Sequence, residues 1–372
     1  MKYLVSIFHP AHVHFYRHVV DELESRGDDV LICARDKDVS VQLLRAFDLP
    51  HTVLASTGDS LSDLVVEQLR YEAKLLLAAR RFDPDVMTSI GGLEVSHVVP
   101  FTGARAVVFD DSEPTPAHHI TAMRYLDAIH TPRRFSADFG PRHHRYDGYH
   151  ELAYLHPDRF TPDPDRLREH GVDPDDRYFV LRFVGWNAHH DVGQRGFSPA
   201  AKRRLVSELA ELGDVYVTNE GTLPADLAEY ETPVPPHVVH DLLYHADLYV
   251  GDSQTMATEA AILGTPAVRS NTFAAAESMS NFVELEDEYG LLHSIGDEDE
   301  AVATALTLAR DPDAKATWRR RRERLLEEKI DVTEYVVDAL ATEARKAHRG
   351  RPARRASALG RVRALLTGGG SE

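Results

Sequence analysis

Residues 251–266, GDSQTMATEAAILGTP, bring hydroxyl, amide and carboxyl groups together in a segment otherwise rich in alanine. Ser253 follows the apolar run LYVGD and has the chemistry of a helix N-cap, which leaves the N–H groups of the first turn free to bind phosphate. Glu259 lies one turn beyond Thr255 on the same face, where a carboxylate can accept hydrogen bonds from ribose hydroxyls. The spacing therefore fits a nucleotide site. An alternative is equally open, in which Ser253 only caps the helix and Glu259 pairs with a basic neighbour such as Arg269.

The loop GWNAHHDVGQRGF at residues 185–197 also concentrates groups that bind ligands. A loop gains little from a tryptophan unless its ring covers something, so we interpret this segment as a ligand-binding loop rather than a structural cover. Its candidate residues, with the arginine of the preceding strand, are Arg182, Trp186, Asn187, His190 and Asp191.

Two further clusters in the first half have the chemistry of proton transfer. In HPAHVHF, His12 can serve as a general base or contact a phosphate, because imidazole takes either protonation state near neutral pH. In FDDSEP, Asp110, Asp111 and Glu113 lie within four residues, and crowded like charges raise one another's pKa. The alternatives are histidines that only cap a helix and acids that cap a turn or remain solvated.

The sequence lacks the motifs of several other enzyme classes. The sequence has no G-x-S-x-G elbow, no G-x-G-x-x-G after a strand and no G-x-x-x-x-G-K-[ST], which argues against serine hydrolysis and against NAD or ATP chemistry. The single cysteine, Cys33, cannot build a metal cage. A Mg²⁺ ion at the acidic cluster is an alternative, but we expect no metal and no cofactor.

The elements that must position these groups follow a regular alternation. Continuous apolar runs such as KYLVSIF, DVLICAR and ARAVVFDD alternate with amphipathic helical segments, which predicts parallel sheets covered on both faces. We predict an α/β, GT-B-like fold of two doubly wound, Rossmann-like domains that face each other across a cleft. The predicted parts are an N-terminal domain at 1–135, a linker at 136–174, a C-terminal domain at 175–345 and a basic, disordered tail at 346–372.

The block PPHVVHDLLYHADLYVGDSQTMATEAAILGTPAVRSN resembles the donor-binding half of GT-B glycosyltransferases and of UDP-N-acetylglucosamine 2-epimerases. Through HPAHVHF, FDDSE, YHELAYLHP and LRFVGWNAHHDVG, the chain to about residue 345 is also similar to the archaeal and bacterial domain-of-unknown-function 354 family. The resemblance implies that the diphosphate binds at Ser253, Gln254 and Thr255. It further implies that Glu259 binds the ribose and that the backbone of Val238 and Val239 contacts the base.

The charge distribution limits the partners. The formal net charge is −18, yet residues 345–372 hold eight Lys/Arg and one Glu, so the body is still more acidic. An acidic body fits a halophile-like protein and makes nucleic acid an unexpected partner. The resemblance to the 354 family implies an archaeal protein. The basic tail offers peripheral membrane contact as an alternative to a solvated extension. With no signal peptide and no run of about 18 apolar residues, we expect a cytoplasmic protein.

These observations lead to one function and two alternatives. The leading hypothesis is a glycosyltransferase that transfers a sugar from a nucleotide-diphosphate sugar, with UDP expected, to a glycan or lipid-linked acceptor in cell-surface glycan synthesis. The first alternative is an epimerase or hydrolase of the nucleotide sugar. The second is a protein that only binds it.

Overall fold

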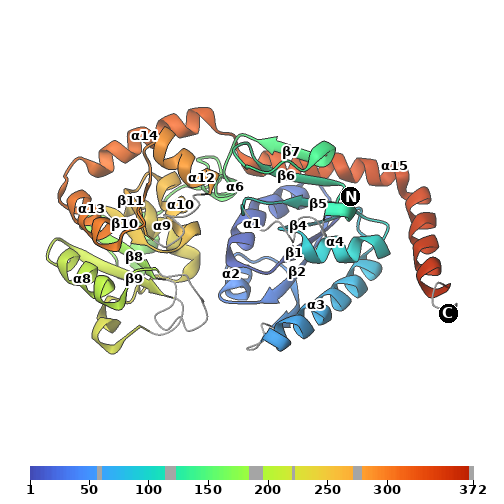
Figure 1. The fold of residues 1–372 in the computed structure, drawn as a ribbon, viewed down its shortest axis with the longest axis horizontal. Coiled ribbons are helices and arrows are strands. Elements are labelled where there is room, and N and C mark those ends of the chain that lie inside the picture. The colour runs from blue at the N-terminus through green and yellow to red at the C-terminus, as the bar shows by residue number, and fades with distance from the viewer. Residues whose placement is uncertain (57–60, 114–122, 184–195, 220–222, 271–278, 368–372) are drawn as a thin grey trace. The chain divides into compact units, whose positions relative to one another are not determined.

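The computed structural model describes residues 1–372 except 57–60, 114–122, 184–195, 220–222, 271–278 and 368–372. The chain divides into two compact units, and each is built on its own parallel sheet (Figure 1). Unit 1 comprises Met1–Tyr154 and Ile330–Glu372, and unit 2 comprises Leu155–Lys329. These two units confirm the prediction of an α/β fold with two doubly wound, Rossmann-like domains.

Unit 1 contains a seven-stranded sheet in the order β3-β2-β1-β4-β5-β6-β7, in which every pair is parallel. The strands are β1 (Lys2–Ile7), β2 (Asp29–Asp36), β3 (His51–Ser56), β4 (Val86–Ile90), β5 (Arg105–Phe109), β6 (Ala128–Pro132) and β7 (His143–Tyr146). The helices of this unit are α1 (Pro10–Ser25), α2 (Ser40–Ala46), α3 (Leu61–Phe82), α4 (Leu93–Val98) and α15 (Val332–Thr367), and α6 (Leu152–Leu155) lies at its boundary. Its central strands are buried along almost their whole length, as the apolar runs predicted.

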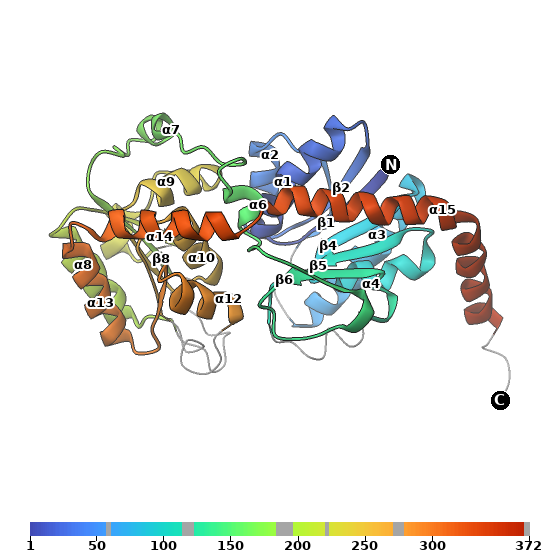
Figure 2. The same cartoon turned by 90° about the horizontal axis from the view of Figure 1, so that it is seen from above.

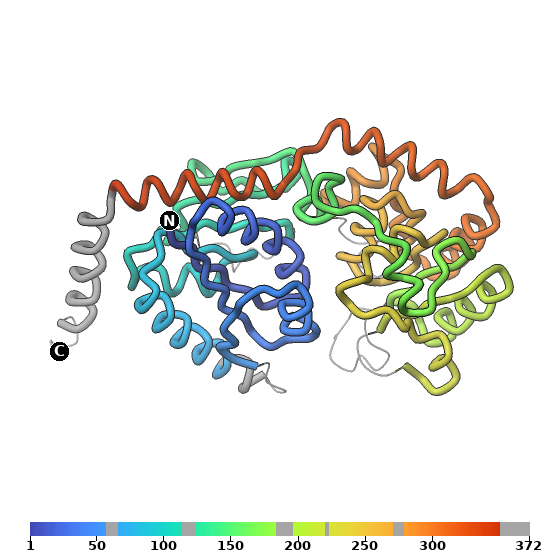
Figure 3. Tube along the Cα trace, turned by 180° about the vertical axis from the view of Figure 1, so that it is seen from behind, coloured from blue at the N-terminus to red at the C-terminus, as the bar shows by residue number. Residues whose placement is uncertain are grey.

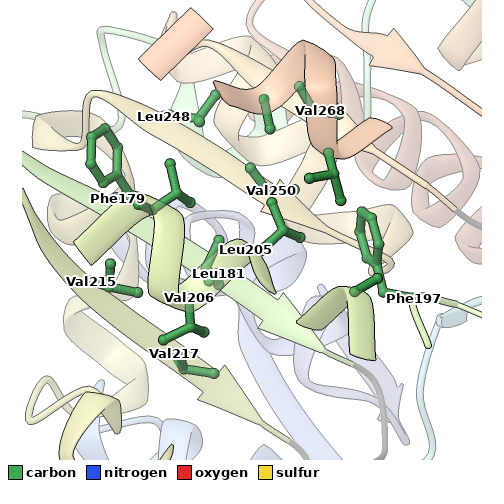
Figure 4. Close-up of a cluster of buried hydrophobic side chains, with 14 of the residues drawn as sticks. Phe179, Leu181, Phe197, Leu205, Val206, Val215, Val217, Leu248, Val250 and Val268 are labelled. Carbon is green, nitrogen blue, oxygen red and sulfur yellow. The ribbon is translucent and has the colours of Figure 1, made fainter. Parts of the chain in front are cut away.

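Unit 2 contains a five-stranded parallel sheet in the order β12-β11-β10-β8-β9. The strands are β8 (Tyr178–Phe183), β9 (Asp214–Asn219), β10 (Leu248–Gly251), β11 (Ala267–Arg269) and β12 (His293–Ser294). The helices are α7 (Pro164–Glu169), α8 (Pro199–Ala210), α9 (Val239–His245), α10 (Gln254–Leu263), α12 (Ser280–Val283), α13 (Glu298–Arg310) and α14 (Ala314–Glu328). Figure 4 shows the core on one face of this sheet, where Leu181, Val250 and Val268 from three strands pack with Leu205 of α8.

The strand order of each sheet reverses at one point. In unit 1 the chain departs in opposite directions from β1 and β4, and in unit 2 from β8 and β10. Open α/β sheets bind ligands at the carboxyl ends of the strands beside such a reversal. His12 follows β1, whereas Arg182 and Ser253 lie at the ends of β8 and β10.

The observed units differ from the predicted boundaries, and the predicted linker at 136–174 is divided between them at Tyr154 and Leu155. Strand β7 lies inside the segment 136–174 that was expected to be a linker, and it adds the seventh strand to the sheet of unit 1. Helix α15 belongs to unit 1 rather than to the C-terminal domain (Figures 2 and 3). Arg105 of β5 forms an ion pair with Glu343 of α15, and Thr333 Oγ1 donates to the carbonyl of Ala153 at 2.6 Å.

Helix α15 extends to Thr367 and so covers part of the segment 346–372. Among the described residues, no helix combines the length and the apolar character needed to cross a membrane.

Candidate functional site

The predicted nucleotide segment forms a strand, a capped helix and a sharp helix end. Ser253 Oγ accepts a hydrogen bond from the N–H of Met256 at 3.4 Å and caps α10. Gly264 ends the helix with φ at +77°, a left-handed conformation that suits glycine. The half-buried Gln254 and Thr255 start the helix, and N–H groups in a first turn have no acceptor within the helix. This end of α10 therefore has the local structure of an anion site.

Glu259 lies on the buried side of α10 and is only 3% exposed. Its Oε1 lies 3.0 Å from Nε2 of His240, a residue of α9 that is equally buried. His240 is thus a basic neighbour in contact with Glu259, and Arg269 donates to Ser294 Oγ at 2.8 Å and covers the ring of Phe282 at 4.0 Å. The contact fixes the position of the carboxylate one turn below the start of α10.

The same contact brings the predicted base-binding residues close to the predicted ribose ligand. Val238 ends a short 3-10 turn, Val239 begins α9, and His240 follows directly. The structure therefore gathers Val238, Val239, Ser253 and Glu259 in one region of unit 2.

Two arginines flank the glycine at the end of β10. Gly251 pairs in register with Arg182 of β8 on one side and with Arg269 of β11 on the other. Neighbouring residues in register point to the same face of a sheet, so both guanidinium groups lie on one face near the start of α10. Burial lowers the pKa of Arg269 to about 10. Arg182 was expected from the sequence, but Arg269 was expected only as a partner of Glu259.

Another buried charge was not expected at all. Lys202 of α8 is buried with its Nζ 5.1 Å from the ring centre of Phe183, and burial lowers its pKa while the nearby Asp252 raises it. The helical spacing could have revealed this lysine, because Leu205, Val206 and Leu209 follow it at i+3, i+4 and i+7. The neighbouring Arg203 and Arg204 are exposed. The predicted loop residues Trp186, Asn187, His190 and Asp191 lie outside the described residues.

A second group of polar side chains lies in unit 1, at the carboxyl ends of β1 and β5. His9 takes the capping role, since its Nδ1 accepts a hydrogen bond from the N–H of Ala11 at 3.2 Å. His12 is buried beside the ring of Phe8. Burial, together with His9 and His150, holds the pKa of His12 well below its ordinary value. His12 is therefore neutral at physiological pH.

The three acids of FDDSEP have different surroundings. Asp110 is 3% exposed and accepts a hydrogen bond from the N–H of Ser112 at 3.0 Å, and burial raises its pKa to about 7. Asp111 is partly exposed and contacts Nδ1 of His150 at 3.4 Å. Glu113 accepts a hydrogen bond from the backbone N–H of Ser136. The structure thus brings His12, Asp110 and Asp111 together with His150, which was not among the expected site residues.

The two units and their order define the chain as a protein of the GT-B fold. Solved structures with this fold include the UDP-GlcNAc 2-epimerase from Methanocaldococcus jannaschii (14% identity, 87% of this chain and 99% of that chain, TM-score 0.56). They also include Spinosyn Rhamnosyltransferase SpnG (14%, 92% and 100%, TM-score 0.60) and S. aureus MnaA in a structure with UDP (13%, 91% and 95%, TM-score 0.62). At such identities the likeness shows the fold alone.

Residues 1–178 match the family described as "Protein of unknown function (DUF354)", which confirms the expected resemblance over that part of the chain. No curated protein matches the sequence.

Proposed function

We propose that this protein is a GT-B glycosyltransferase that transfers a sugar from a nucleotide-diphosphate sugar, with UDP as the expected nucleotide, in cell-surface glycan or glycoconjugate synthesis. The observation that carries the proposal is the start of α10, where Ser253 caps the helix directly after β10 and the buried Glu259 is held by His240. A capped helix start favours a diphosphate, and a fixed carboxylate one turn away favours ribose hydroxyls.

In this proposal Ser253, Gln254 and Thr255 bind the diphosphate, Glu259 binds the ribose, and the backbone of Val238 and Val239 contacts the base. The acceptor oxygen bonds to the anomeric carbon as the bond from that carbon to the diphosphate breaks. The bonding electron pair leaves with the diphosphate, whose charge the helix start and Arg182 stabilise. The acceptor proton moves to a base in unit 1, either His12 or one of Asp110, Asp111 and Glu113. No divalent metal takes part.

The test incubates the purified protein in high-salt buffer with a panel of nucleotide sugars, and with glycan and lipid fractions as acceptors. Transfer predicts that nucleotide release depends on one acceptor fraction and that the sugar appears in that fraction. Release that never depends on an acceptor would count against transfer. Full activity in EDTA is expected, and a requirement for added Mg²⁺ would contradict the metal-free mechanism.

Epimerisation of the nucleotide sugar is a second candidate, because two of the structures with this fold, from M. jannaschii and S. aureus, are a UDP-GlcNAc 2-epimerase and a protein solved with UDP. A C2 epimerase exchanges the proton at C2 with solvent, using acids such as those at 110–113. Incubation in D₂O followed by mass spectrometry of the sugar measures this exchange. No deuterium under conditions of demonstrated binding excludes it, and tight UDP binding without turnover favours a protein that only binds.

A further inference from the structure

The candidate bases of unit 1 differ in how easily the hydroxyl of a sugar acceptor can reach them. A general base must reach the hydroxyl and must be unprotonated at the working pH. Asp110 and His12 are both buried, and Glu113 is engaged with the backbone of Ser136. The side chain of Asp111 is 23% exposed, so it can be reached from solvent.

The buried His150 lies in contact with Asp111. His150 Nδ1 lies 3.4 Å from Asp111 Oδ2, and the His150 side chain is 7% exposed. The ring is fixed on two sides, because Phe15 of α1 lies 4.7 Å from it and Tyr146 of β7 stacks on it at 6.3 Å with an interplanar angle of 7°. This packing leaves the imidazole little freedom to turn away from the carboxylate.

The surroundings of His150 favour one neutral tautomer. Its Nε2 is buried and meets no hydrogen-bond partner within the described part of the chain, whereas Nδ1 lies 3.4 Å from a carboxylate oxygen, which can only accept. Burial also lowers the pKa of His150, while Asp111 acts in the opposite direction. A neutral imidazole that carries its proton on Nδ1 places this N–H beside the Asp111 carboxylate, whereas the other tautomer would place a lone pair there.

We propose that Asp111 is the general base of the transfer reaction and that His150 is its positioning residue. This inference rests on the proposed function and selects one base among the four candidates. The acceptor hydroxyl gives its proton to Asp111 as the acceptor oxygen bonds to the anomeric carbon and the diphosphate leaves with the electron pair. His150 keeps its own proton and holds the carboxylate in one orientation before and after the transfer.

Two substitutions of His150 separate positioning from packing. His150→Asn retains a donor near the place of Nδ1, whereas His150→Phe retains the ring and removes the donor. We expect His150→Phe to lower kcat about 10-fold to 100-fold, because a misplaced reacting group loses rate on that scale. His150→Asn should recover most of this loss. His144→Asn, an exposed histidine of β7 in the same unit, is the matched control and should not change kcat.

The assay measures release of UDP, or of whichever nucleotide the panel identifies, from the sugar nucleotide and acceptor fraction that the panel identifies. Calorimetric titration with that nucleotide accompanies it and should give the same affinity for all variants. Asp111→Asn should lower kcat by at least 100-fold. A second readout is ¹⁵N NMR of the histidine rings, in which the signals lost in His150→Asn should be those of a neutral imidazole protonated at Nδ1.

Distinct results would overturn this assignment and the proposed function. If the wild type binds the nucleotide and transfers sugar but His150→Phe or Asp111→Asn matches it, the assignment is wrong and the proposed function stands. An imidazole protonated at Nε2 would also overturn it. If the wild type binds no nucleotide, the proposed function fails and this inference fails with it.

Discussion

Replacing Asp110 with asparagine should stabilise the protein at alkaline pH and have little effect in acid. Asp110 is buried at the end of β5, and burial raises the pKa of its carboxyl from 3.8 to about 7. An acid with a raised pKa binds its proton more tightly in the folded state than in the unfolded state. The free energy of unfolding therefore falls as pH rises from about 4 to about 7 and then stays at the lower level.

The size of the effect follows from the shift. A displacement of about 3 pKa units corresponds to about 4 kcal/mol at 1.36 kcal/mol per unit, which we take as the upper bound. Asparagine does not titrate and retains an oxygen that can accept the hydrogen bond from the N–H of Ser112. The variant should therefore gain roughly 2–4 kcal/mol over the wild type at pH 8 and approach it near pH 4.

Thermal melts of both proteins at pH 4.5 and pH 8, in the same high-salt buffer, measure this difference. With about 2–4 °C per kcal/mol for a domain of this size, the variant should melt at least about 4 °C above the wild type at pH 8. Asp338→Asn, at a side chain that is 73% exposed, is the control and should follow the wild type. If Asp110→Asn and the wild type show the same pH dependence, the carboxyl does not titrate as burial predicts and the reasoning is refuted.

Three further substitutions test other parts of the structure. Glu259→Gln retains an acceptor for His240 but loses the charge-assisted hydrogen bonds to ribose. In a calorimetric titration, UDP affinity should therefore fall about 10-fold to 100-fold, with little change in melting temperature. Equal affinity with a lower melting temperature would favour a purely structural role. Gly251→Ala would place a Cβ 2.6 Å from the carbonyl oxygen of Arg182, so the free energy of unfolding should fall by about 1–3 kcal/mol. A thermal melt measures this loss, and an unchanged melting temperature would contradict the packing at this strand end. Arg105→Ala removes the partner on β5 of the buried Glu343 and should lower the free energy of unfolding by about 3 kcal/mol. Proteolysis inside α15 should become faster, and adding Glu343→Gln should restore part of the stability. Equal proteolysis would show that this ion pair does not hold α15.

The sequence by itself determined the features that depend on neighbouring residues. Apolar runs such as KYLVSIF predicted strands buried on both faces, because a parallel strand covered by helices must be apolar along its length. Ser253 predicted the start of α10, and Gly264 ends that helix in a left-handed conformation. Each of these features depends on a few consecutive residues whose backbone and hydrogen-bonding preferences act locally.

Only the tertiary structure decided which distant groups meet. His240 is 19 residues from Glu259 in the chain and reaches it because α9 packs beside α10. His150 reaches Asp111 because β7 joins the sheet in a segment that looked like a linker. Helix α15 returns to unit 1 through Glu343 and Arg105, 238 residues apart. An amphipathic pattern shows that a helix needs a partner, but the choice of partner depends on the shape and charge of a surface assembled from the whole chain.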